Sequence, residues 1–195
     1  MKTKEITEKY AKKVSKRQIR NKKRTNYAWI IMVTLCALVI SFGFSLLAEL
    51  IIPNTSIVVA IITLLIFIFL GILFDMVGVA VTVSDEKTFH SMSAKKVKGA
   101  RLGVKLISNA EKVSSFCNDV IGDICGIVSG STSAMIATLL ITKFNFNPLY
   151  ITLVITSVVA SLTIGGKALG KGLAIRQSNA ILYRFARVLS VFYHR

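Results

Sequence analysis

Residues 57–83 read IVVAIITLLIFIFLGILFDMVGVAVTV, an apolar run in which Asp75 is the one charged residue. At about 1.5 Å of rise per residue, a helix of this length exceeds the ~30 Å core of a bilayer. The run therefore predicts a transmembrane helix. The composition of the chain agrees, because 53% of its 195 residues are hydrophobic and the mean hydropathy is +0.65.

Three further apolar runs lie at about residues 29–50, 113–141 and 149–166. The fourth run continues into GGKALGKG, residues 165–172, whose glycines indicate either a helix break or a close-packed turn. We predict an all-α, polytopic membrane protein with a basic tail over residues 1–27. A single transmembrane domain with four transmembrane helices follows over residues 28–195.

The cations are distributed unevenly along the chain. Of the 25 Lys and Arg, 11 precede the first run, 7 lie from Lys87 to Lys112 and 6 follow the fourth run. The last one, Lys143, lies in the loop between the third and fourth runs. Because cytoplasmic segments carry the excess of Lys and Arg, both termini and the middle loop are predicted to be cytoplasmic. We expect a multi-pass protein of the bacterial inner membrane. The net charge of +16 then serves orientation and contact with anionic lipids rather than binding to nucleic acid.

Residues 85–112 and 172–195 combine cations with regularly spaced apolar residues. In the second segment Ile175, Leu182 and Phe185 recur at helical spacing, with arginines between them. This pattern predicts short amphipathic juxtamembrane helices that lie along the cytoplasmic leaflet of the bilayer.

Ionisable side chains inside the apolar runs are the candidate functional residues. Asp75 lies eight residues before Val83, a rise of about 12 Å, and Asp123 lies ten residues after Val113, about 15 Å. Lys167 lies 18 residues after Leu149, a rise of about 27 Å, and so also falls in the inner half of the bilayer if the fourth helix continues to it. A charge facing lipid at mid-membrane costs on the order of 3 kcal/mol, so these side chains are expected to face one another or water. Further candidates on the third run are Asp119, Ser129, Ser131 and Thr132.

The packing pattern leaves two interpretations of these charges open. Gly122, Gly126, Gly130 and Ala134 recur every fourth residue and predict a face on which another helix packs closely. In the first interpretation the carboxylates line an ion pathway, with Asp75 and Asp123 as oxygen ligands of a metal such as Mg²⁺. In the second, Asp75, Asp123 and Lys167 form a structural salt-bridge cluster in a membrane scaffold or assembly factor.

Enzymatic chemistry is not indicated by the sequence. Phosphate-binding loops, nucleophile elbows and metalloprotease motifs are absent from it, and the three cysteines lie in apolar runs without zinc-site spacing. We therefore predict that the chain is not an enzyme.

From about residue 60 onward the chain resembles the transmembrane domain of the cyclin M (CNNM) and CorB/CorC magnesium-transporter family. The stretch FDMVGVAVTVSDEKTFHSM stands where the family has a Ser-x-Ser-Glu-x-Ala-like segment, and Gly122-Asp123 stands over its Gly-Asn. Residues 166–171, GKALGK, resemble its Gly-Glu-Ile-x-Pro-Lys signature. The resemblance implies transport or sensing of a divalent cation and a homodimer.

The chain departs from the family at the positions that the family associates with the cation pathway. Where the family associates a serine, an asparagine and a glutamate with the cation pathway, this chain has Asp75, Asp123 and Lys167. An ammonium between two carboxylates would occupy the cation's place; alternatively, Lys167 reaches the interface and leaves the carboxylates free. The family commonly appends nucleotide-binding CBS modules, whereas this chain ends at Arg195, so we expect such control to be missing or to come from a separate regulatory protein. Residues 1–56 are not covered by the resemblance.

Overall fold

The computed structural model describes residues 27–51, 56–144 and 147–192. Within these ranges every regular element is a helix, which confirms the all-α class. The elements are α2 (Tyr27–Ile51), α3 (Ile57–Val83), α4 (Glu86–Ala94), α5 (Ala100–Ser108), α6 (Ala110–Ser115), the π-helix η1 (Phe116–Gly122), α7 (Asp123–Phe144), α8 (Pro148–Arg176) and α9 (Ser178–Phe192).

The chain divides into two compact units, Met1–Cys36 and Ala37–Arg195. The described part of the first unit is the beginning of α2, and the predicted basic tail lies outside the described residues except for Tyr27. The second unit holds the rest of α2 and all the other elements. Within that unit the ring of Phe44 lies 5.8 Å from the ring of Phe67 on α3, edge to face.

Four helical stretches are long and apolar enough to cross a membrane: Trp29–Leu50, Ile57–Val83, Ala110–Phe144 and Pro148–Arg176. Their number agrees with the predicted four spans, and the third combines α6, η1 and α7 into one continuous rod. The fourth corrects the sequence-based expectation, because α8 continues through GGKALGKG to Arg176. The alternative of a helix break at these glycines is wrong.

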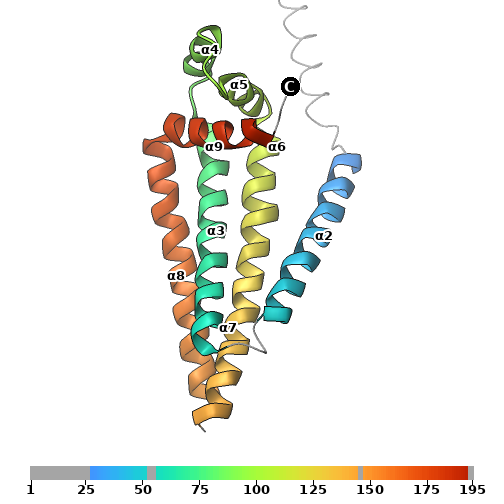
Figure 1. Cartoon of the computed structure of the whole chain (residues 1–195), viewed down its shortest axis with the longest axis vertical. Helices are drawn as coiled ribbons and strands as arrows, with labels where there is room; N and C mark the ends of the chain where they lie inside the picture. The colour runs from blue at the N-terminus through green and yellow to red at the C-terminus, as the bar shows by residue number, and fades with distance from the viewer. Residues whose placement is uncertain (1–26, 52–55, 145–146, 193–195) are drawn as a thin grey trace, which may run out of the picture. The chain divides into compact units, whose positions relative to one another are not determined.

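Helices α3, α7 and α8 form a bundle (Figure 1). Glycines on α8 allow the closest approach, because a Cβ added at Gly166 would overlap the side chain of Ile72. A Cβ added at Gly170, one turn later, would lie 2.8 Å from the side chain of Met76. The glycine-rich end of α8 is therefore a packing surface for α3.

A second glycine surface lies on α3, facing η1 and α7. A Cβ added at Gly71 would lie 3.1 Å from that of Cys125, and one added at Gly78 would overlap the side chain of Asn118. By contrast, a Cβ at Gly126 or Gly130 would meet no atom within 4 Å. Of the predicted small-residue face, Gly122 is buried near Gly71 of α3 and Lys167 of α8, whereas Gly126 and Gly130 do not lie where the neighbouring helices pack in the described structure.

One end of the bundle carries a cap made of α4, α5 and α9, with α9 lying across the helix ends (Figure 1). Phe89 of α4 and Leu182 of α9 are fully buried there, together with Val77 and Val81 of α3 and Cys117 of η1. The predicted amphipathic segments thus form helices that share one apolar core with the bundle.

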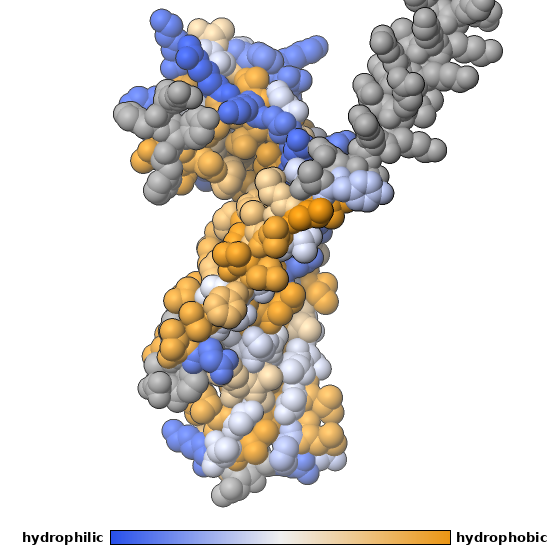
Figure 2. Space-filling view, turned by 90° about the vertical axis from the view of Figure 1, so that its right-hand side faces the viewer, coloured by the Kyte–Doolittle hydropathy of each residue, from blue (hydrophilic) through white to orange (hydrophobic). Residues whose placement is uncertain are grey.

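Hydropathy on the surface changes along the bundle axis. Figure 2 shows apolar residues over the middle of the visible face and hydrophilic residues gathered at the end that carries the cap. Large hydrophobic side chains are exposed along α3 and α8, for example Ile62, Phe69 and Leu162. Such a band matches the environment of a bilayer, as the four long apolar helices also do.

Candidate functional site

Asp75 is the buried charge of the bundle, with 4% of its surface exposed. It lies on the same face of α3 as Gly71 and Gly78, which precede and follow it by about one turn. These glycines are the positions where η1 and α7 approach α3 most closely. The Asp75 Oδ2 atom accepts no hydrogen bond within the described structure.

Lys171 of α8 is the ionic partner of Asp75, with Nζ 3.6 Å from Oδ2. The lysine side chain is 50% exposed, whereas the aspartate side chain is 5% exposed. Charge-assisted hydrogen bonds usually measure about 2.7–2.9 Å, so this ammonium neutralises the carboxylate without making a close hydrogen bond.

Lys167, one turn before Lys171, forms a second and separate pair. Its Nζ lies 3.7 Å from Oδ1 of Asp123 and donates a hydrogen bond of 3.3 Å to the carbonyl oxygen of Gly122. The Lys167 side chain is 22% exposed and that of Asp123 is 68% exposed. The expected three-membered cluster of Asp75, Asp123 and Lys167 is therefore replaced by two pairs, and Lys167 does not lie beyond a break.

The order of residues on α8 explains this arrangement. Gly166 and Gly170 approach α3, and the lysine that follows each glycine is rotated by about 100° around the helix, toward the carboxylates. Lys171 was missed from the sequence because the helix was expected to end near residue 166. Lys171 follows Lys167 by four residues, so the two lysines share one face of an unbroken helix. That spacing is the signal in the sequence that points to Lys171.

Asn118 is the second polar residue that sequence reasoning missed. It lies in the π-helix η1, packed over Gly78, and its Nδ2 donates to Ser114 Oγ at 3.4 Å. The Oδ1 atom is buried and has no hydrogen-bond partner in the described structure. π-Helical turns within longer helices are frequent at functional sites, and their position is not visible in the residue pattern.

Three of the remaining candidates on the third span, Asp119, Ser129 and Ser131, have local partners, and Thr132 does not. Asp119 is exposed and accepts a hydrogen bond of 2.7 Å from Ser115 Oγ. Ser129 is buried and donates to the carbonyl of Cys125 at 2.7 Å, and Ser131 donates to that of Val128 at 3.0 Å. Thr132 is fully buried and its hydroxyl makes no hydrogen bond in the described structure.

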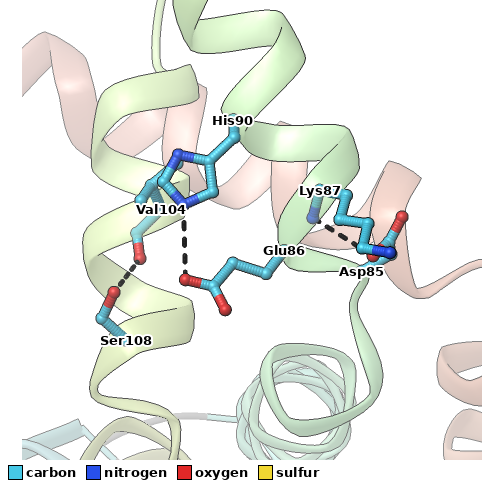
Figure 3. A network of polar contacts seen from close by, with 6 residues as sticks. All are labelled: Asp85, Glu86, Lys87, His90, Val104 and Ser108. Carbon is cyan, nitrogen blue, oxygen red and sulfur yellow. Dashed lines mark hydrogen bonds and ion pairs between the residues drawn. The ribbon is translucent and has the colours of Figure 1, made fainter.

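The cap holds another group of polar contacts, near the start of α4 (Figure 3). Asp85 caps α4 by accepting from the backbone N–H of Lys87 at 3.1 Å and from the Thr88 hydroxyl at 2.7 Å. The bond from Thr88, then that from Lys87, lowers the pKa of Asp85 below its usual 3.8. His90 and Glu86 pair at 3.4 Å within the same helix. These contacts cap and stabilise α4.

The atoms of this site that could hold a metal ion are oxygens. Across residues 27–51, 56–144 and 147–192, no group of three or more His, Cys, Asp and Glu side chains is placed to hold a metal ion. Asp75 Oδ2 and Asn118 Oδ1 are buried acceptors without donors, on facing surfaces of α3 and η1. Carboxylate and amide oxygens are ligands that Mg²⁺ and Ca²⁺ accept, with water or backbone carbonyls completing the set.

Comparison with models of known families, with curated proteins and with solved structures finds no match to this chain.

Proposed function

We propose that this chain is a multi-pass membrane protein that transports or senses a divalent cation such as Mg²⁺, as its resemblance to the CNNM and CorB/CorC family implies. The observation that carries the proposal is the pair of buried oxygens, Asp75 Oδ2 and Asn118 Oδ1, which lack hydrogen-bond donors in the described structure. Buried acceptors are normally satisfied, so their lone pairs favour a positively charged ligand.

The cation would bind between α3 and η1 at the level of Asp75. Because glycines stand at 71 and 78, the side chains of Cys125 and Asn118 pack directly against the backbone of α3, and the Asn118 amide reaches the face of α3 that carries Asp75. Asp123, exposed on α7, would supply a second carboxylate along the route, with Asp119 and Ser129 on either side of it in the sequence. Intramembrane carboxylates are costly, which favours a functional use for them.

The orientation follows from the distribution of cations. We propose that both termini and the cap are cytoplasmic in the cell membrane, because residues 84–112, which hold α4, α5 and the start of α6, carry 7 of the 25 Lys and Arg. The basic cap and tail would then contact anionic lipids.

A homodimer formed through the outer face of α7 is part of the proposal. This face exposes Asp119 of η1 and, on α7, Asp123, Ile127, Gly130, Ala134 and Thr138, whereas the exposed face of α3 carries mainly large hydrophobic residues. Polar and small side chains at membrane depth are better covered by protein than by lipid. A second copy of α7 offers the same face in return.

A membrane scaffold is the second candidate, and the two ion pairs favour it. Lys171 beside Asp75 and Lys167 beside Asp123 link α8 to α3 and α7 without any bound ion. In this case the charges serve helix packing and the protein moves no cation.

Magnesium flux into liposomes separates the two candidates. The reconstituted wild type is compared with Asp75→Asn and with Glu111→Gln, which removes an exposed carboxylate of α6. Transport predicts Mg²⁺ uptake by the wild type and Glu111→Gln, and its loss in Asp75→Asn with the fold intact. A sensor predicts binding of Mg²⁺ without uptake, and the scaffold predicts neither uptake nor binding by any of the three proteins.

A further inference from the structure

We infer that Lys171 is a tethered cation that makes the Asp75 site selective for divalent over monovalent ions. This inference rests on the proposed function, in which the Asp75 site binds a divalent cation. Its starting point is that the Lys171 ammonium lies where a bound cation would neutralise Asp75, with Nζ 3.6 Å from Oδ2.

The ammonium is held loosely enough to be displaced. It neutralises the carboxylate from a distance, since Oδ2 accepts no hydrogen bond in the described structure. Half of the Lys171 side chain is exposed, so the ammonium can move toward solvent while its aliphatic stem stays on the helix surface.

Valence decides which ions can displace it. A tethered group competes at an effective concentration in the millimolar range or above, because it never leaves the neighbourhood. Sodium or potassium would replace one positive charge by another and gain no Coulomb energy. A divalent ion at the same distance interacts about twice as strongly with the carboxylate, so it can displace the lysine ammonium.

Lys167 differs from Lys171 and provides a matched comparison. Its ammonium donates a hydrogen bond to the Gly122 carbonyl and is less exposed, at 22%. Its carboxylate partner, Asp123, is 68% exposed on the face of α7 that we assign to the homodimer, so it is not enclosed by the bundle. Removing Lys167 should open no buried site for a monovalent ion.

Thermal unfolding of the purified protein tests the inference, in choline, sodium, potassium or magnesium chloride at one ionic strength. For the wild type we expect the melting temperature to rise with Mg²⁺ and to be equal in choline, Na⁺ and K⁺. For Lys171→Met we expect stabilisation by Na⁺ and K⁺ relative to choline, and a Mg²⁺ midpoint at least tenfold lower than that of the wild type. Lys171→Gln keeps a neutral donor for Asp75 and replaces the Met variant if that variant does not fold.

Two controls isolate the effect of Lys171. Lys167→Met removes the neighbouring charge, and Lys143→Met removes an exposed charge at the far end of α7. Neither variant should respond to Na⁺ or K⁺. The double change Asp75→Asn with Lys171→Met should respond to none of the cations.

The outcomes separate the two proposals. If the wild type responds to Mg²⁺ but Lys171→Met shows no monovalent response, the tethered-cation inference is wrong and the proposed function stands. The same holds if Lys167→Met gains an equal monovalent response. If neither the wild type nor Lys171→Met responds to Mg²⁺, the proposed function fails. A Mg²⁺ response confined to Lys171→Met overturns both, because the lysine would then exclude divalent ions too.

Discussion

At the scale of single residues, the two members of the Asp75–Lys171 pair differ in burial. The carboxylate is buried in the bundle, whereas half of the lysine side chain reaches solvent. Removing the lysine therefore affects stability differently from removing the aspartate. A buried charge without a partner is strongly destabilising, but a lysine near the surface can extend into water.

This asymmetry gives a prediction for stability in choline chloride, without small cations. Lys171→Met should lower the free energy of unfolding by about 2–3 kcal/mol, since it leaves the Asp75 charge unpaired. Asp75→Asn should cost less than about 1 kcal/mol, because Lys171 then becomes solvated. Denaturation in detergent followed by circular dichroism measures both values. Equal losses for the two variants would contradict the burial difference.

At the scale of elements, the glycines of α8 have opposite roles according to the side they face. A side chain at Gly166 would meet Ile72 of α3, whereas one at the adjacent Gly165 would enter open space. We predict that Gly166→Leu destabilises the protein by about 1–3 kcal/mol through overpacking, and that Gly165→Leu does not. Thermal unfolding of the two variants provides the measurement. A larger effect for Gly165→Leu would show that α8 packs on its other face.

The cap of α4 gives a second prediction at this scale. Asp85→Ala removes the acceptor for the Lys87 N–H and the Thr88 hydroxyl, so the melting temperature should fall. Glu86→Gln, which loses only the exposed pair with His90, should lower it less. The pKa of Asp85 is lowered in the folded state. Its contribution is therefore present above the unfolded pKa of about 3.8 and is lost as the pH falls through the folded value. The difference in melting temperature between wild type and Asp85→Ala should vanish in acid. A difference that stays the same at every pH would contradict this.

The helices could be predicted from sequence more reliably than the site could. Runs such as residues 57–83 predict a helix by length and apolarity alone. Each glycine costs up to about 1 kcal/mol in a water-exposed helix, which made a break at residues 165–172 plausible. In lipid, however, an interrupted helix would leave backbone groups unsatisfied, so the continuous α8 is favoured. Lys171 and Asn118 were missed because they depend on that continuity and on the π-helix η1.

At the scale of the whole molecule, the faces of the bundle differ in what they present to the surroundings. Large hydrophobic residues cover the outside of α3, whereas the outer face of α7 exposes Gly130, Ser131 and Ala134 beside Ile127. This difference is the reason for proposing that a second copy covers α7.

Self-association tests that proposal. We predict that Gly130→Ile converts a dimer into a monomer in detergent, because the branched side chain prevents close approach of two helices. Gly165→Ile, in open space on α8, should leave the dimer intact. Light scattering after size-exclusion chromatography measures the mass. A wild type that is monomeric at every concentration, or a Gly130→Ile dimer, would contradict the proposed interface.

Binding of Mg²⁺ to the purified protein by isothermal titration calorimetry tests the Asp75 site most directly. The wild type should bind the ion saturably, Glu111→Gln should bind it with the same affinity, and Asp75→Asn should lose the binding while keeping the helical content of the wild type. Equal binding by wild type and Asp75→Asn, or no binding by the wild type, would contradict the assignment of a cation site to Asp75.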